Sequence, residues 1–436
     1  MNAVAHAEPL APYRAAYEAA SHDGSGTQAF RAAAFARFTE LGFPAAREEA
    51  WKYTSLRRLA SRKFSLPDYA ASQSERPVLP APLAEHVVVM SNGALQFGLA
   101  TLDKLPTGLR VRSLEQARRD GEPLGALLRV PSGGGTERFA ALNSALCPDV
   151  LVIDVAAGAR PEGALHVVVA ATGAGAEMAH PRIVVRAAAG SVARIILHHQ
   201  GDDAAERFVN AFVDVEVGPD ATLHLYRLQA QGGKSFLIER IDATVGQRGS
   251  FVMHDAQLGG SLARLDLNAR LVAPGAATEL TGVFLADGSR HLDTHALVDH
   301  LAPDTRSLLD YRGVAAGHGR AVFNGKAVVH EGAQKSQARQ SSRNLLLTPG
   351  AEIDTKPELE IYADDVQCSH GATTGQLDPA ALFYLRSRGL TEVEARSALT
   401  RAFAGTVLSR MDLPRFATAV HAALDGRLDR LLETTA

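Results

Sequence analysis

Residues 212–226 read Phe212-Val213-Asp214-Val215-Glu216-Val217-Gly218-Pro219-Asp220-Ala221-Thr222-Leu223-His224-Leu225-Tyr226. The first part of this stretch alternates apolar and polar side chains, a Gly-Pro-Asp turn follows, and the alternation then resumes. Alternation with a period of two is typical of a β-strand that buries one face. The stretch therefore predicts two strands joined by a tight turn, with no helix between them.

The same turn recurs along the chain at an interval of 28 or 29 residues, at Gly190, Gly218, Gly246, Gly275, Asp304 and Gly332. Strand patterns occur before and between these turns, at residues 150–153, 166–169, 182–185, 194–197, 241–245, 267–272, 277–284 and 326–330. A fixed period in which no unit buries its own apolar face is the signature of a solenoid. We therefore predict a β-helix or a stacked β array. An antiparallel β-sandwich with regular hairpins has the same strand density and is the alternative.

Helical patterns flank this β-rich region. Residues 31–41 and 47–59 carry apolar side chains at helical spacing, and residues 64–82, rich in Pro, Ser and Ala, resemble a linker. Near the other end, Asp378 and Pro379 predict a helix N-cap with proline at the first helical position. We divide the chain into an N-terminal helical domain with linker at 1–85, a β-helix core at 86–375 and a C-terminal helical domain at 376–436.

The C-terminal domain is predicted to contain two more helices. Thr391 and Glu394 form a capping box. The helix that they open has a predicted apolar face of Ala395, Leu399, Ala402, Phe403 and Val407. The last helix is expected to begin near Asp412 and to run toward Leu432.

The composition restricts the class of protein. Hydrophobic residues make up 46% and charged residues 21% of the 436 residues, and the formal net charge is -3, so neither disorder nor binding to a polyanion is expected. No apolar run reaches the roughly 18 residues that cross a bilayer, and residues 1–8 lack the features of a signal peptide. Two cysteines, Cys147 and Cys368, cannot build a disulfide framework. We expect a cytoplasmic protein with no nucleic acid or membrane partner.

Motifs of the common enzyme classes do not occur. Gly232-Gly233-Lys234-Ser235 resembles the end of a P-loop, but Leu228 stands where its first glycine is required. The Gly-x-Ser-x-Gly, His-Glu-x-x-His and Cys-x-x-Cys motifs are absent too. His198-His199 lies at the end of a strand pattern, and we interpret it as a surface pair. No catalytic residue is therefore assigned.

One short segment concentrates side chains that can do chemistry, Asp364-Asp365-Val366-Gln367-Cys368-Ser369-His370-Gly371. In a strand, Asp364, Cys368 and His370 share a face, with Cys368 and His370 about 7 Å apart. Thiolate and imidazole suit iron and zinc, and a neighbouring histidine can lower a thiol pKa. Two donors make only half of a site that usually needs about four. The alternative is that Cys368 is a buried small apolar residue and His370 a turn residue.

Residues 354–378, from Asp354-Thr355-Lys356-Pro357-Glu358 through Cys368-Ser369-His370-Gly371-Ala372 to Gly375-Gln376-Leu377-Asp378, resemble the signature of the SufB/SufD family of iron-sulfur cluster assembly proteins. The likeness continues through residues 382–389 and includes residues 49–54, whereas residues 1–45 carry little signal. The Cys-Ser-His-Gly-Ala form and the chain length are more similar to the SufD branch than to the SufB branch.

The resemblance implies a right-handed parallel β-helix with helical ends that serves as a scaffold in a complex. It implies pairing with SufB through the ends of the two β-helices, and docking of the ATPase SufC on the C-terminal helices. The docking candidates on this chain are Tyr384, Arg388, Thr391, Glu394, Leu399 and Phe403. His370, with Cys368 beside it, is implied as a ligand for iron or a nascent cluster that is transient and shared with SufB. No tightly bound cofactor is expected in the isolated chain, and a homodimer is considered when SufB is absent.

A second hypothesis comes from another class of proteins. Many parallel β-helices are polysaccharide lyases or hydrolases, which use clustered carboxylates and aromatic platforms along a groove. Aromatic residues make up only 6% of this chain, and its single tryptophan, Trp51, lies in the N-terminal region. The composition therefore favours the scaffold over the enzyme.

Overall fold

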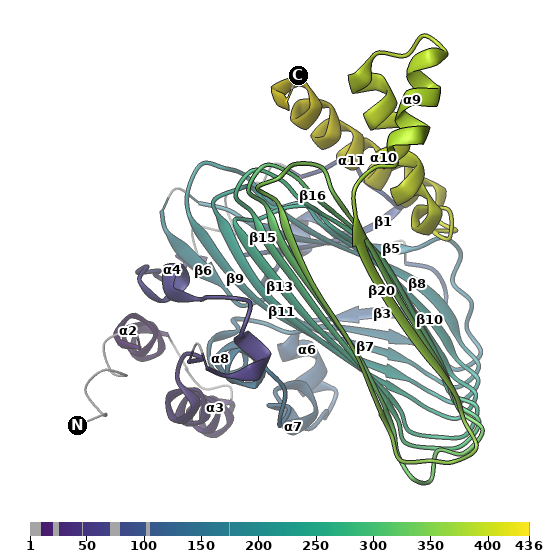
Figure 1. Cartoon of the computed structure of the whole chain (residues 1–436). Helices are drawn as coiled ribbons and strands as arrows, with labels where there is room; N and C mark the ends of the chain where they lie inside the picture. The colour runs from purple at the N-terminus through teal and green to yellow at the C-terminus, as the bar shows by residue number, and fades with distance from the viewer. Residues whose placement is uncertain are drawn as a thin grey trace.

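The computed structural model describes residues 10–20, 26–45, 47–69, 79–101, 105–173 and 175–435, with side chains to residue 431. Its centre is a solenoid in which the chain alternates between two sheets, and helices flank it at both ends of the chain (Figure 1). Residues 1–8, which we interpret as lacking signal-peptide features, and residues 70–78 of the expected linker lie outside the described residues.

Each sheet is built from every second strand of the coiled chain. The first sheet contains, in spatial order, β2 (Ala94–Leu95), β1 (His86–Ser91), β5 (Leu165–Ala171), β8 (Val192–Gly201), β10 (Thr222–Gln229), β12 (Ser250–Gln257), β14 (Ala277–Ala286), β16 (Arg306–Ala315), β18 (Gln337–Leu346) and β20 (Gln367–Gly375). The second contains β19 (Glu352–Ile361), β17 (Arg320–Val329), β15 (His291–His300), β13 (Leu262–Leu271), β11 (Ser235–Val245), β9 (Arg207–Val217), β7 (Arg182–Ala187), β4 (Leu151–Val155) and β3 (Leu109–Arg112), with β6 (Glu177–Ala179) beside β9.

The pairing confirms the solenoid and excludes the sandwich. From β4 and β5 onward, neighbouring strands are parallel, which hairpins cannot produce. Side chains one coil apart stack in ladders, and the ladder Leu225, Met253, Leu280 and Leu309 lies in the apolar core between the sheets. The repeat of 28 or 29 residues is thus the length of one coil.

The turns differ in one detail from the expected glycine pattern. Gly190 (φ 70°), Gly275 (φ 75°) and Asp304 (φ 61°) have the left-handed backbone themselves, but at two other turns it belongs to Asp220 (φ 56°) and Arg248 (φ 52°), two positions after Gly218 and Gly246. A Cβ on Gly218 would lie 3.0 Å from the Ala187 carbonyl oxygen, so this glycine serves close packing between coils.

The interpretation of His198-His199 as a surface pair is wrong, because both side chains are buried in β8. His199 lies inside the solenoid, where its Nε2 is 2.8 Å from Glu239 Oε1. Arg227 donates to Glu239 at 2.6 Å and to Asp255 at 2.7 Å. Burial alone would raise the pKa of Glu239, but Arg227 and His199 hold it well below its usual range. The core therefore contains an ionic network in which Arg227 links two carboxylates, while Arg227 Nη2, Asp255 Oδ2 and His199 Nδ1 have no hydrogen-bond partner among the described residues.

Helices of the first third of the chain cover the outer face of the second sheet (Figure 1). They are α2 (Ala11–Ala19), α3 (Gln28–Leu41), η1 (Glu49–Trp51), α4 (Arg57–Ala60), α6 (Leu114–Arg119), α7 (Leu124–Leu127) and α8 (Glu137–Leu146), whereas η2 (Phe97–Leu99) packs beside β1 and β5 of the first sheet. Phe38 and Phe139 pack there with Phe208 of β9 and Phe236 of β11. The predicted continuous helix over 47–59 is wrong, and α6 to α8 lie within the range expected for the β core.

The C-terminal helices are α9 (Pro379–Ser387), α10 (Glu392–Leu408) and α11 (Pro414–Thr435). Their starts follow the predicted chemistry, since Asp378 accepts a hydrogen bond from Ala380 N at 2.9 Å and Thr391 forms its capping box with Glu394. Helices α10 and α11 pack on the outer face of the first sheet. Ala402 is exposed, against the predicted apolar face. Within the described residues, no helix is long and apolar enough to cross a membrane.

Candidate functional site

The solenoid ends in an uncovered coil. β20 is the last strand of one sheet and β19 the last of the other, and among the described strands each pairs on one side only. In Figure 1 this end faces the viewer, with β20 drawn in green in front of the earlier coils. The unpaired edges are ten and nine residues long, which is a long template for pairing with another chain.

Cys368 and His370 lie on the inward-facing side of this last coil. Cys368 stacks on Ala338, and His370 stacks on Gln340. The ladder below His370 continues through the core residues Leu309 and Leu280, so His370 occupies the position that a core leucine has elsewhere. The predicted common face of Cys368 and His370 follows from this register. Asp364 is not part of it, because it lies in the bend before β20 begins at Gln367.

The two side chains differ in their surroundings. Cys368 is half-buried against Ala363 and Val366, whereas His370 is exposed because no further coil covers it. Burial raises the pKa of the Cys368 thiol, although a backbone hydrogen bond with Ala338 acts in the opposite direction. In the chain by itself the net effect on the pKa of Cys368 is thus a rise, to which His370 makes no resolved contribution.

A thiol and an imidazole are the metal-binding donors at this end. Within the described residues, no third His, Cys, Asp or Glu side chain joins them in a group that could hold an ion. Gln340 lies directly below His370, and its Oε1 is buried without accepting a hydrogen bond from any described residue. The sequence reasoning missed Gln340, although the repeat places it one coil before His370.

The rim of the open end is mixed in character. Ile361 and Tyr362 are 44% and 63% exposed, which is unusual for side chains of their size. Along β19, alternate residues direct their backbone N–H to opposite edges, and Glu352 N bonds to Gly319 O of the previous coil. Pro357 is an odd number of residues from Glu352, so it occupies a position whose N–H would face the open edge. Proline is tolerated in strands at such edge positions.

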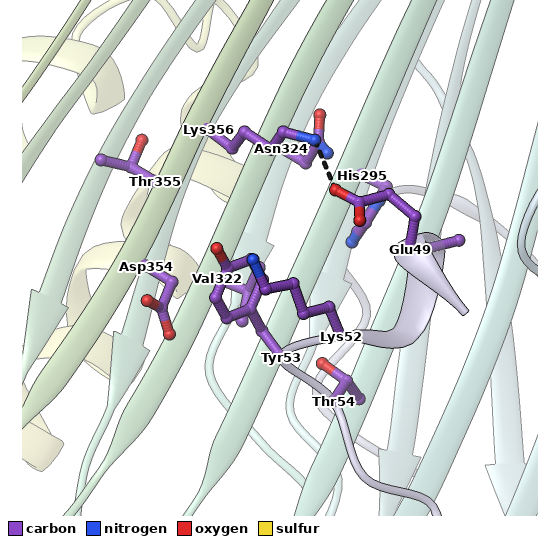
Figure 2. A pocket seen from close by; sticks show the side chains of 11 residues that line it. Glu49, Lys52, Tyr53, Thr54, His295, Val322, Asn324, Asp354, Thr355 and Lys356 are labelled. Atoms are coloured by element: carbon purple, nitrogen blue, oxygen red, sulfur yellow. Dashed lines mark hydrogen bonds and ion pairs between the residues drawn. The ribbon is translucent and has the colours of Figure 1, made fainter. Parts of the chain in front are cut away.

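The N-terminal signature segment meets the C-terminal signature strand at a small pocket beside this end. Figure 2 shows Glu49 reaching across to Lys356 of β19, and the two side chains form an ion pair of 2.8 Å. Thr54 donates to Asp293 Oδ2 at 2.6 Å, and the Arg264 guanidinium lies 3.9 Å from the centre of the Trp51 ring. The two segments, some 300 residues apart in sequence, thus form one structural unit.

The residues predicted for docking divide into two groups. Tyr384 and Arg388 are exposed around α9, with the guanidinium 5.2 Å from the ring centre. Phe383, which the sequence reasoning did not select, is 75% exposed on the same helix. The other four are engaged locally or half-buried: Thr391 and Glu394 cap α10, Phe403 packs toward the solenoid, and Leu399 is half-buried. α9 has no buried residue, so it is the helix that presents a free apolar face.

Two family models match the chain. The one described as "SUF system FeS cluster assembly, SufBD core domain" matches residues 168–403, and "SufBD protein N-terminal region" matches residues 13–167. An iron-sulfur cluster assembly SufBD family protein of Synechocystis is 31% identical over 404 residues, covering 89% of this chain and 86% of that protein. The iron-sulfur cluster assembly protein SufD of Escherichia coli is 30% identical over 366 residues, covering 83% and 84%. A SufBD family protein of Mycobacterium leprae is 28% identical over 414 residues, covering 90% and 93%.

Proposed function

Because the chain belongs to the SufBD family of SUF-system iron-sulfur cluster assembly proteins and is close to SufD, we propose that it is a non-catalytic scaffold subunit of the SUF complex. It pairs with SufB through the open end of the solenoid, binds the ATPase SufC through its C-terminal helices, and contributes to iron acquisition and nascent cluster assembly. The observation that carries the proposal is the uncovered last coil with Cys368 and His370 on its inward-facing side.

The unpaired edges support the pairing with SufB. An exposed strand edge of nine or ten residues favours aggregation unless a partner completes its hydrogen bonds. A second solenoid of matching cross-section provides strands for both edges at once, and it also covers the inward-facing side chains. In the absence of SufB, the same surface is available to a second copy of this chain, so a homodimer of the isolated protein belongs to the proposal.

The donor set supports a shared cluster site. Cys368 and His370 supply two donors of the types that iron-sulfur chemistry uses, and a partner across the open end supplies the rest. Iron or a nascent cluster is the cargo of this site, held transiently between two subunits, and no tightly bound group belongs to this chain alone. The raised pKa of Cys368 agrees with a thiol that becomes a ligand only when metal displaces its proton.

The exposed helix α9 supports the docking of SufC. Phe383 and Tyr384 present apolar area, and Arg388 holds the Tyr384 ring from one side. Aromatic and arginine side chains dominate the binding energy at protein interfaces. In this proposal Thr391, Glu394, Leu399 and Phe403 set the position of α10 beneath α9. The proposal also includes the division of the chain into domains at residues 85 and 375. It includes a location in the cytoplasm, where Cys147 and Cys368 stay free thiols.

The test is co-purification of the tagged chain from its host, followed by anaerobic iron and sulfide analysis. We expect a SufB-like protein and an ABC-type ATPase in the eluate, and cluster signal that falls at least tenfold in the His370→Ala variant while both partners are still recovered. Ser369→Ala is the matched control, because Ser369 is exposed on the opposite side of β20. Recovery of the wild-type chain without partners, or full cluster loading of His370→Ala, contradicts the proposal.

A further inference from the structure

A second group of metal-binding side chains lies far from the open end. It comprises His224 on β10, His254 on β12 and Asp412 in the connection between α10 and α11. Each offers one ligand atom, and these atoms all lie within 4.8 Å of one another. His254, on the nearer strand β12, lies four strands from β20, which is about 19 Å at the usual spacing between strands. The group is therefore independent of Cys368 and His370.

The surroundings of His254 leave one ring nitrogen free. His254 Nδ1 is 2.8 Å from Thr281 Oγ1, and the Thr281 hydroxyl donates in turn to the Met253 carbonyl at 3.4 Å. The hydroxyl oxygen therefore accepts from Nδ1–H, and the lone pair of Nε2 is available. A metal-binding histidine is typically oriented in this way through its second nitrogen.

The other two side chains are also available to a ligand. His224 is half-buried on the same outer face, and its Nδ1 is buried without a hydrogen-bond partner among the described residues. Asp412 accepts a hydrogen bond from Tyr226 OH, which fixes one carboxylate oxygen. The Arg194 guanidinium lies 3.6 Å from the other oxygen. The side chains of Arg194 and Asp412 are 35% and 50% exposed. This weak ion pair can give way to a metal ion.

The local charges permit a divalent cation. Glu279 and Asp310 flank the group, and Arg410 from the end of α10 pairs with Glu279 at 3.0 Å and with Asp310 at 3.7 Å. With Asp412 and Arg194 included, three carboxylates face two arginines.

We propose that His224, His254 and Asp412 form a binding site for a divalent transition-metal ion of the Fe²⁺, Co²⁺ and Zn²⁺ class. Two histidines and one carboxylate with open positions are the donor set of non-haem Fe²⁺ sites, and hard ions such as Mg²⁺ prefer all-oxygen sites. Such ions hold ligand atoms at about 2.0–2.2 Å, so the three atoms must approach to roughly 3.4 Å of one another. The half-buried His224 and the exposed Asp412 can rotate to make that approach.

The site joins two parts of the molecule that are distant in sequence. Its histidines belong to the solenoid and its carboxylate to the helical connection that carries α11. A bound ion therefore holds the C-terminal helices against the solenoid, in addition to the contact of Phe416 with the Tyr226 ring at 5.3 Å. Metal binding is expected to slow amide exchange in residues 409–416.

The experiment uses the full chain with Cys368 and His370 both replaced by alanine, freed of metal and titrated with Co²⁺ under nitrogen. We expect saturable binding of one equivalent with a visible absorption band, and none with Mg²⁺. In this background, His224→Ala should abolish saturable binding, and Asp412→Asn should weaken it at least tenfold. Asp412→Asn keeps the shape of the side chain, so a folding defect does not confuse the result.

His421→Ala is the matched control, since His421 is exposed on the neighbouring helix α11. It should leave the Co²⁺ affinity unchanged. The proposal is overturned if the background chain binds no Co²⁺, if His224→Ala and Asp412→Asn bind it as well as the background does, or if His421→Ala weakens it equally. Because the donors at the open end are already removed, none of these outcomes bears on the role of Cys368 and His370.

Discussion

The two ends of the solenoid are closed in different ways. At the N-terminal end the sheets finish in antiparallel strands of two and four residues, β2 and β3. β2 is buried, and on β3 the Arg112 guanidinium is occupied by Asp120, Glu122 and Asp154. At the C-terminal end the sheets finish in parallel strands of ten and nine residues with no such cover.

This difference agrees with the proposal that the C-terminal end binds a partner. Short edge strands and charged side chains are the usual means of preventing contact between sheet edges. The N-terminal end uses short, covered strands, whereas the C-terminal end has long uncovered strands, with charged side chains and Pro357 on β19 but a thiol and an imidazole on β20. The repeating coils are alike along the solenoid, so the difference between the two ends comes from the terminal strands alone.

The largest expected effect is on the free energy of unfolding. It compares a substitution at one ladder position inside the solenoid with a substitution at the same position at the open end. Leu309 is fully buried, two coils below His370 in the same ladder. Leu309→Ala should lower the free energy of unfolding by about 2–5 kcal/mol, because it leaves a cavity in the core. His370→Ala should change it by less than about 0.5 kcal/mol, because that side chain is exposed. Urea unfolding followed by circular dichroism measures both.

Equal destabilisation by the two substitutions would contradict the comparison, since it would mean that position 370 is covered as position 309 is. Leu346→Ala is a useful intermediate, because Leu346 is only half-buried at the edge of the same core. We expect its effect to lie between the other two.

The next effect concerns the edge of β20. Gln367 N bonds to Ser336 O in the previous coil, and successive residues of a strand direct their N–H to opposite edges. Ala372, an odd number of residues later, therefore directs its N–H to the open edge. Ala372→Pro removes this donor without breaking a bond to β18, and it should weaken association with the partner at least tenfold. Size-exclusion chromatography with the co-expressed partner measures this.

Ala372→Ser is the control for Ala372→Pro, because it keeps the N–H and should pair normally. Unchanged association of the proline variant, with a folded chain, would show that the partner does not pair with β20.

The fold could be predicted because its signal is local and repeated. Alternation gave the strands, the 28- or 29-residue interval gave the coil, and the caps at Asp378 and Thr391 gave the helix starts. The helix expected over 47–59 failed because tertiary contacts override the local pattern: Trp51 donates to the Gly135 carbonyl at 2.9 Å, and Thr54 bonds to Asp293. These partners are remote in sequence, so no local pattern contains them.

The candidate site could be predicted only in part for the same reason. A period of two was enough to place Cys368 and His370 on one face. The exposure of His370 depends on the absence of a further coil, and the raised pKa of Cys368 depends on its burial against Ala363 and Val366, and no residue type encodes either one. The group of His224, His254 and Asp412 escaped the sequence reasoning because Asp412 comes from a helical connection more than 150 residues later in the chain.

The smallest effect uses the two cysteines, which lie in contrasting surroundings. Cys147 is fully buried beside Leu114 and Val150, while Cys368 is half-buried at the open end. Iodoacetamide should therefore label only Cys368. Because the thiolate reacts and burial raises the pKa of Cys368, the labelling rate should rise with pH through a midpoint above the value of about 8.5 for a free cysteine.

Cys368→Ala should abolish the labelling at every pH, which assigns the signal. Association with the partner should protect Cys368, because the open end is then covered, while the buried Cys147 stays unlabelled in both states. A midpoint below that of a free cysteine would mean that His370 or another cation stabilises the thiolate, and the open end would then hold a nucleophile instead of a protonated ligand awaiting metal.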